Sequence, residues 1–168
     1  ISGGYYVYEC FWNANGALPD DWSVQTETGT ASLKTAALRF PDKHSLLLDS
    51  LNGDVAFEKS ISPVTGNVIF EINTFQTQKR SDFYINLSSG SEATVSVTSD
   101  GSSFGYIDEF GAFVPFYAYV DNVWYHIKLD VDLENQICDI YLNNKLKARG
   151  IKLRNKLQTI DNISIEAG

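Results

Sequence analysis

The sequence predicts an all-β fold in which two antiparallel sheets pack face to face as a β-sandwich of the jelly-roll kind. Two observations support this fold class. Short segments with strand-like composition recur along the chain between clusters of Gly, Pro, Asn, Asp and Ser. No stretch shows the apolar spacing of an amphipathic helix. The expected strands span residues 5–12, 31–40, 45–49, 54–61, 67–75, 82–87, 93–98, 104–107, 117–120, 122–132, 137–144 and 161–166.

The most regular pattern lies in the two late segments. Residues 125–131 and 138–142 are apolar at every second position, which is the period of a half-buried strand. The connector 132–136 is short and polar, so we expect an antiparallel hairpin with one face in a core. The alternate positions would then share the other face, if Ile127 and Leu129 lie beside Ile140 and Leu142.

This hairpin carries a family resemblance. The arms Trp-Tyr-x-Ile-Lys-Leu-x-x-Asp at 124–132 and Asp-Ile-Tyr-Leu-Asn-Asn at 139–144 resemble the late hairpin of concanavalin A-like and laminin G-like β-sandwiches. Many bacterial carbohydrate-active enzymes carry such sandwiches as accessory modules. Residues 18–24 resemble the Gly-x-x-Pro-x-Gly-Trp opening of these modules, although Asp21 replaces the usual Gly. The resemblance covers most of the chain and implies a concanavalin A-like fold.

The composition bounds the function. The 168 residues are enough for one domain, and we expect residues 1–168 to form a single β-sandwich. A formal net charge of −8 argues against nucleic acid and against an anionic membrane surface, and we expect the 13 Lys and Arg residues to be scattered. No apolar run is long enough for a membrane helix. The chain contains no Met, so we expect a module of a longer protein.

The two cysteines, Cys10 and Cys138, exclude a disulfide-rich scaffold and a multi-cysteine zinc motif. Each lies in an expected strand. Two buried thiols that act as small apolar side chains are one alternative, and a single bridge between an early and a late strand is the other.

The sequence offers no convincing catalytic motif. Related sandwich hydrolases place acidic residues on alternate positions of one strand, but in Asp130-x-Asp132-x-Glu134 the last residue falls in the expected turn. The carboxylates of Asp108 and Glu109 would point to opposite faces of any strand. An alternative is a polysaccharide lyase in which His126 acts as base beside the cation Lys128. The signature strands of sandwich-type lyases are missing, so we expect no catalytic residues.

A binding surface is the stronger expectation. Sugars stack their C–H faces on aromatic rings, and amides, carboxylates and basic groups bind their hydroxyls. A solvated sheet face would carry the same residue types, so both interpretations stay open. The basic residues among the candidates would suit an acidic polysaccharide. The candidate ligand-binding residues on the polar sides of the expected strands are Tyr84, Asn86, His126, Lys128, Asp139 and Tyr141.

A second candidate surface is the aromatic stretch 104–117, which holds six aromatic residues, two Gly and one Pro. These rings cannot all enter one core, so we expect some of them, Phe113 included, to emerge on a loop as a contact platform. A hydrophobic plug at one end of the sandwich is the alternative.

The closing segment 160–166 resembles the last strand of jelly-roll carbohydrate modules, which often place a structural calcium beside their terminal strands. Asp161 has the parity of the core-facing residues, and a carboxylate there needs a metal or backbone N–H partners. A turn cap and a calcium site, with Glu9, Asn13 or backbone carbonyls as further ligands, are the two alternatives.

These observations predict a non-catalytic carbohydrate-binding module. The resemblance implies that it is secreted or at the cell surface, tethered to a catalytic domain, and holds a polysaccharide-degrading enzyme on its polysaccharide. No cofactor is required beyond the possible calcium. The alternatives are a β-sandwich glycoside hydrolase or polysaccharide lyase, and a laminin G-like adhesive or protein-binding domain.

Overall fold

A computed structural model describes residues 22–27, 31–34, 45–48, 54–76 and 83–167. Within these ranges the chain consists of antiparallel strands joined by turns and bends. None of the described segments forms a helix long and apolar enough to cross a membrane. The expected strand 5–12 lies outside the described residues, together with Cys10, Glu9 and Asn13.

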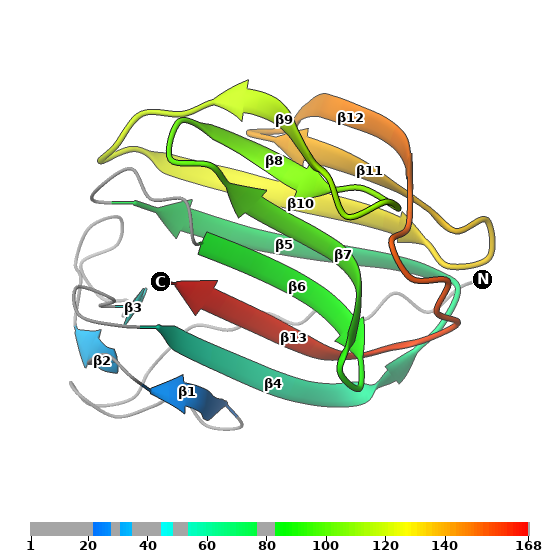
Figure 1. The fold of residues 1–168 in the computed structure, drawn as a ribbon, viewed down its shortest axis with the longest axis horizontal. Coiled ribbons are helices and arrows are strands. Elements are labelled where there is room, and N and C mark those ends of the chain that lie inside the picture. Colours follow the sequence, from blue (N-terminus) through cyan, green and yellow to red (C-terminus); the bar gives the residue numbers. More distant parts are fainter. Residues whose placement is uncertain (1–21, 28–30, 35–44, 49–53, 77–82, 168) are drawn as a thin grey trace.

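Two sheets form the sandwich (Figure 1). A pair of short strands, β2 (Ala31–Lys34) and β3 (Ser45–Leu48), stands apart from both. The four-stranded sheet has the order β12 (Lys145–Lys152), β11 (Ile137–Leu142), β10 (Trp124–Asp132), β5 (Asn67–Phe75). The seven-stranded sheet has the order β1 (Ser23–Glu27), β4 (Val55–Val64), β13 (Ile160–Ala167), β6 (Phe83–Ser89), β7 (Glu92–Ser99), β8 (Ser103–Ile107), β9 (Phe113–Ala118).

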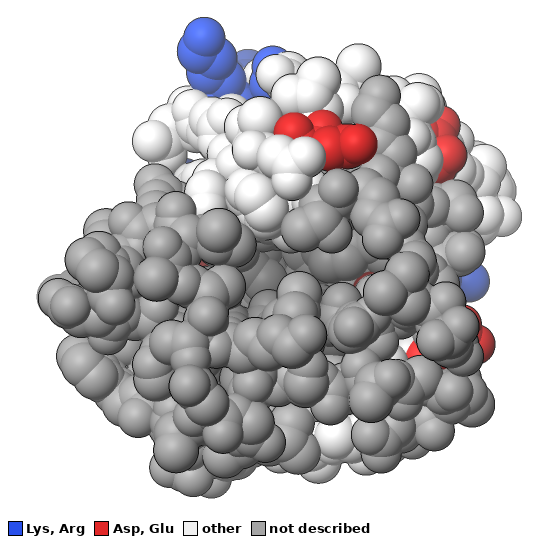
Figure 2. Space-filling view, turned by 90° about the vertical axis from the view of Figure 1, so that its left-hand side faces the viewer, with Lys and Arg blue, Asp and Glu red and all other residues white. Residues whose placement is uncertain are grey.

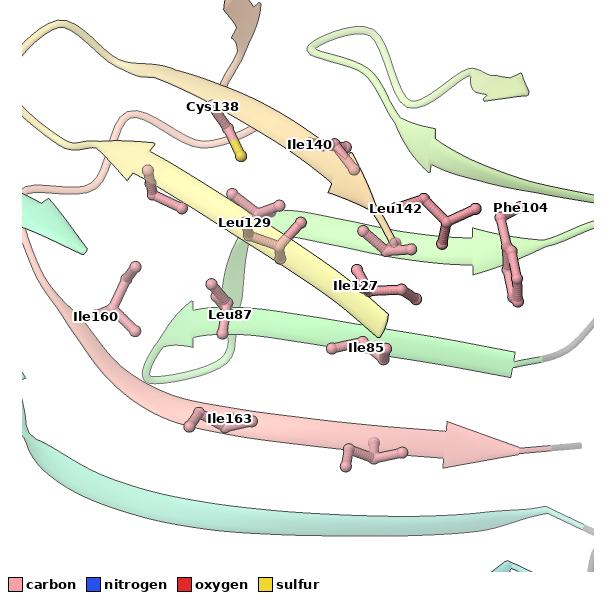
Figure 3. Packing of buried hydrophobic residues seen from close by; sticks show 14 of the residues in the cluster. Ile85, Leu87, Phe104, Ile127, Leu129, Cys138, Ile140, Leu142, Ile160 and Ile163 are labelled. Atoms are coloured by element: carbon pink, nitrogen blue, oxygen red, sulfur yellow. The ribbon is translucent and has the colours of Figure 1, made fainter. Parts of the chain in front are cut away.

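The core fills the space between the two sheets, and strand alternation places its residues there. Along β10 every second side chain is buried, and β11 follows the same pattern. Figure 3 shows Ile127 and Leu129 of the four-stranded sheet packed with Ile85 and Leu87 of β6 and with Ile163 of β13. Burial of such side chains is the main favourable term in folding, at about 1.5–3 kcal/mol for each one fully buried.

The predicted hairpin is confirmed, and so is its alignment. Ile127 pairs with Leu142 and Leu129 with Ile140, so the residues between them share the outer face of the four-stranded sheet. The connector is a turn in which Asp132 Oδ1 accepts the backbone N–H groups of Glu134 and Asn135. Glu134 is exposed in this turn, as expected.

A second hairpin follows directly, and it was not predicted. Asn143 and Asn144 both have positive φ, of 49° and 64°, which is the backbone of a two-residue turn of the primed kind that suits right-twisted strands. Asn tolerates this left-handed conformation better than most residues. The chain therefore reverses at 143–144 and continues as β12, the edge strand of the four-stranded sheet.

The aromatic stretch is a hairpin rather than a loop. Residues 103–107 and 113–118 pair as β8 and β9, so the expected strand 117–120 begins four residues earlier than predicted. The turn between them is fixed by Asp108, whose Oδ1 accepts the N–H groups of Phe110 and Ala112 at 2.9 and 2.8 Å. Pro115 is tolerated because β9 is an edge strand.

Candidate functional site

The outer side of the four-stranded sheet brings together four of the predicted residues. We call this surface the hairpin face and define it by Glu71 of β5, His126 and Lys128 of β10, and Asp139 and Tyr141 of β11. Strand alternation turns these side chains away from the core, because Ile127, Leu129 and Ile140 between them point inward and are fully buried. Glu71 is exposed, and the other four residues of the hairpin face are half-buried.

Tyr141 and Lys128 occupy the centre of this face. The two residues are direct cross-strand partners, and the Lys128 Nζ lies 4.4 Å from the centroid of the Tyr141 ring. A cation at this distance is attracted to the aromatic ring by about 0.5–1 kcal/mol at an exposed site. The contact holds an ammonium donor beside an aromatic ring, and these are two of the kinds of group with which a sheet surface can bind a sugar.

His126 lies next along β10 and is held by its backbone. Its N–H donates to Asn143 Oδ1 at 2.9 Å, and its carbonyl accepts the N–H of Asn143 at 2.8 Å. The His126 Nε2 lies 4.0 Å from Glu71 Oε2, with Glu71 half-exposed. The turn between β11 and β12 therefore fixes the backbone that carries the imidazole at one end of the hairpin face.

Two carboxylates lie at the other end of this face. Asp130 and Asp139 are cross-strand partners on β10 and β11, an arrangement that costs stability when both are charged. The Asp139 Oδ1 accepts the N–H of Gly150 at 2.6 Å, which compensates part of that cost and ties β12 to β11. Beneath them Cys138 is a free, fully buried thiol, while Cys10, the other cysteine of the two alternatives, lies outside the described residues.

The structure does not bring Tyr84 and Asn86 to the hairpin face. Both lie on β6, which belongs to the seven-stranded sheet, and their side chains point to the outer side of that sheet. The Asn86 Nδ2 donates to Ser164 Oγ at 3.1 Å and to Glu166 Oε1 at 2.7 Å. Its amide is thus already used within the sheet.

Phe113 packs against its own hairpin. A Cβ built at Gly105 would lie 2.3 Å from Cε2 of the Phe113 ring and 2.6 Å from the carbonyl oxygen of Val114. The ring therefore covers the space that the glycine leaves, and Phe113 is half-buried. The aromatic side chain that emerges from this hairpin is Phe110, which is 86% exposed at the turn.

Asp161 caps a turn of the seven-stranded sheet. Its Oδ2 accepts a hydrogen bond from Ser89 Oγ at 2.9 Å, and its Oδ1 accepts the N–H of Gly90 at 3.0 Å. This arrangement fits the turn-cap alternative. Among the residues that the structure describes, no group of three or more His, Cys, Asp or Glu side chains is placed to hold a metal ion. Calcium at Asp161 stays a prediction, and its suggested co-ligands Glu9 and Asn13 lie outside those residues.

Comparison with known proteins identifies the fold. No protein-family model and no curated protein matches the sequence. Among solved structures, a sialidase aligns with 88% of this chain and 13% of its own at 14% identity, with a TM-score of 0.72. The globular domain of T. cruzi calreticulin aligns with 88% of this chain and 77% of its own at 12% identity, with a TM-score of 0.58.

A Bacillus licheniformis β-glucanase aligns with 99% of this chain and 85% of its own at 15% identity, with a TM-score of 0.56. The chain therefore has a concanavalin A-like β-sandwich fold, as the resemblance implied. At these identities the likeness concerns the fold alone, which serves both enzymes and binding proteins.

The sequence interpretation missed two features of the surface. One is the exposed Phe110, because periodicity does not show which ring of an aromatic stretch occupies a turn. The other is β12, whose cations lie beside the hairpin face. The signal for β12 was present in the paired asparagines 143–144, which favour a tight hairpin turn.

Proposed function

We propose that this chain is a non-catalytic carbohydrate-binding module that holds a polysaccharide-degrading enzyme on its polysaccharide substrate. The observation that carries the proposal is the Tyr141 ring on the outer side of an open sheet with the Lys128 ammonium 4.4 Å from its centroid. Around this pair stand His126, Glu71 and Asp139, which supply donors and acceptors for hydroxyl groups. The fold supports the proposal as a scaffold and does not by itself assign a ligand.

The hairpin face suits a ligand better than the outer side of the seven-stranded sheet does. On that second surface the polar groups bind one another, as in the hydrogen bonds from Asn86 to Ser164 and Glu166. Its neighbours Ser96 and Thr98 are buried, at 3% and 2% exposure. A sugar would have to break existing hydrogen bonds there, whereas on the hairpin face the His126 and Glu71 side chains are 24% and 49% exposed and approach each other only to 4.0 Å.

The expected affinity is weak. One stacked ring and a few hydrogen bonds, each worth about 0.5–1.5 kcal/mol net, give a Kd on the order of 10 µM to 1 mM for a hydrated sugar. Such an affinity suits a module that must release and rebind along a polymer, and tethering to a catalytic domain raises the effective concentration of that domain at the substrate. The proposal places the protein outside the cell, where polysaccharides occur.

The test is retention of the protein in affinity gels that contain a panel of polysaccharides. We expect Tyr141→Ala to abolish retention on the polymer that retains the wild type. Tyr84→Ala is the matched control, because it removes the same side chain from the other sheet and should leave retention unchanged. Loss of retention in Tyr84→Ala or Phe113→Ala but not in Tyr141→Ala would move the site away from the hairpin face.

A second candidate function is a polysaccharide lyase. The observation that favours it is that His126, Lys128 and Tyr141 share one face, since β-elimination needs a base for the proton beside a carboxylate and a cation to neutralise that carboxylate. Incubation of the purified chain with uronic acid polymers, followed by ultraviolet absorbance of unsaturated products, separates the candidates. Product release that disappears in His126→Ala would replace the binding module with the enzyme.

A further inference from the structure

The cations of this acidic protein are concentrated in one segment. Six of the 13 Lys and Arg residues lie between residues 145 and 156, and no Asp or Glu occurs between Asp139 and Asp161. The expectation that the basic residues would be scattered was wrong, because the net charge of −8 averages this segment with a more acidic remainder. An asymmetry of this kind indicates a surface with its own electrostatic character.

The structure places this segment along one rim of the sandwich. We define the basic rim by its exposed members, Lys145, Arg149, Lys152, Arg154 and Lys156, on β12 and on the connection to β13. Figure 2 shows Lys and Arg side chains projecting from the upper edge of the molecule, the level at which Figure 1 shows β12. An eight-residue strand spans about 26 Å at 3.3 Å per residue, so the charges form a line rather than a disc.

The rim is well anchored. Lys147, the sixth cation, is half-buried, and its Nζ lies 4.7 Å from the centroid of the Tyr117 ring on β9, the edge strand of the other sheet. The connection is fastened to β7, where Arg154 N donates to Thr94 O at 3.0 Å and Asn155 Nδ2 to Ala93 O at 2.7 Å. The cations are therefore presented by ordered backbone at fixed spacing.

An exposed aromatic ring stands at one end of the rim. Glu109 in the turn between β8 and β9 lies 3.2 Å from Lys152 Nζ, and Figure 1 shows this turn beside the connection from β12 to β13. The next residue, Phe110, is 86% exposed and its N–H is bonded to Asp108 Oδ1. The ion pair thus holds an open ring near the cations.

We propose that the basic rim, with Phe110 at its end, binds an acidic polysaccharide through the carboxylate or sulfate groups of that polymer. This inference rests on the proposed function and names the substrate class of the same surface, because Tyr141 on the hairpin face pairs with Leu146 of β12. A polymer strand that stacks on Tyr141 would therefore lie directly beside the basic rim. Arg and Lys side chains pair with anionic groups by charge-assisted hydrogen bonds.

The line of charge favours a polysaccharide over a membrane surface or a nucleic acid duplex. A membrane surface or a nucleic acid duplex is broad, so it would also approach the acidic remainder of the protein, and charges within a Debye length of about 10 Å at 0.1 M salt would repel it. A single polysaccharide strand can follow the rim alone. Cations on an edge strand also discourage pairing between sheets of different molecules, and this structural role needs no ligand.

The experiment compares matched polymers and matched variants. Retention is measured in affinity gels containing dextran, dextran sulfate or polygalacturonate, at low salt. The variants are Arg149→Gln/Arg154→Gln, which removes two charges, and Arg149→Lys/Arg154→Lys, which keeps them. We expect wild type to be retained by the two acidic polymers more than by dextran. The Gln variant should lose about two- to thirtyfold in affinity for them, and the Lys variant much less.

Tyr141→Ala and Phe110→Ala complete the set. A Gln variant that keeps full affinity for the acidic polymers, or wild type that binds dextran as well as dextran sulfate, would overturn the proposal and leave the proposed function standing. Wild type that binds no polysaccharide would refute both, and self-association of the Gln variant in that case would assign the rim to edge protection.

Unchanged affinity in Phe110→Ala would remove that ring from the site. Equal binding to anionic lipid vesicles or to single-stranded DNA would overturn the assigned partner class.

Discussion

Ile140 and Tyr141 are neighbours in β11 whose side chains point to opposite sides of the sheet. Ile140 is fully buried, so Ile140→Ala is expected to lower the free energy of unfolding by about 2–5 kcal/mol. Tyr141→Ala removes a contact with Lys128 worth about 0.5–1 kcal/mol and should cost no more than that. Urea unfolding followed by circular dichroism checks both values, and equal losses would show that Tyr141 is part of the core.

Asp132 gives a pH-dependent contribution to stability. The hydrogen bonds from the Asn135 side chain and from the N–H groups of Asn135 and Glu134 hold the pKa of Asp132 below its ordinary value. The unfolded carboxyl binds a proton at higher pH than the folded one, so this stabilisation is present above the unfolded pKa and is lost as the pH falls through the folded pKa.

The comparison is between wild type and Asp132→Asn, which keeps the shape of the side chain and removes the charge. We expect the difference in free energy of unfolding to be largest near neutral pH and to shrink between about pH 5 and pH 2. Glu134→Gln is the control, because Glu134 is exposed in the same turn. A difference that stays constant with pH would show that the carboxylate charge does not stabilise the turn.

At the scale of elements, the hairpin of β8 and β9 depends on one glycine. A Cβ at Gly105 would overlap the Phe113 ring and the Val114 carbonyl, so Gly105→Ala should lower the free energy of unfolding by about 1–3 kcal/mol. In a Phe113→Ala background the same substitution should cost less, because the ring is gone while the carbonyl remains. A double-mutant cycle measured by thermal unfolding checks this coupling. Independent, additive losses would contradict the packing of the ring on the glycine.

The elements also show where prediction from the sequence succeeds and where it fails. The hairpin of β10 and β11 was predicted because its alternation and its turn are local properties of the chain. The division of the candidate residues between two sheets was not predicted. Alternation assigns a face to Tyr84, but it does not reveal the strand that pairs with β6. Beside its neighbour β7, the strand that pairs with β6 is β13, more than seventy residues away, and long-range pairing of this kind leaves little local signal.

At the scale of the whole molecule, Cys138 reports the opening of the sandwich. The thiol is fully buried, and burial, with the nearby charges of Asp139 and Asp130, raises its pKa to about 12. At pH 8 the folded thiol is therefore both inaccessible and protonated, and only the thiolate reacts. We expect labelling of Cys138 by a disulfide reagent in a Cys10→Ala variant to proceed at the rate of global unfolding. Labelling much faster than unfolding measured by tryptophan fluorescence would indicate local opening of β11.

The position of β13 affects how the protein is made. This strand lies between β4 and β6 (Figure 1), so those two strands have no direct pairing with each other and wait for residues 160–167. During synthesis on the ribosome, the larger sheet cannot close until this last strand has emerged. The nascent chain must therefore hold β4 and β6 with one unpaired edge each while the roughly seventy residues between β6 and β13 are made, which takes about four to fourteen seconds at 5–20 residues per second. Folding of this domain is thus coupled to completion of its C-terminal strand.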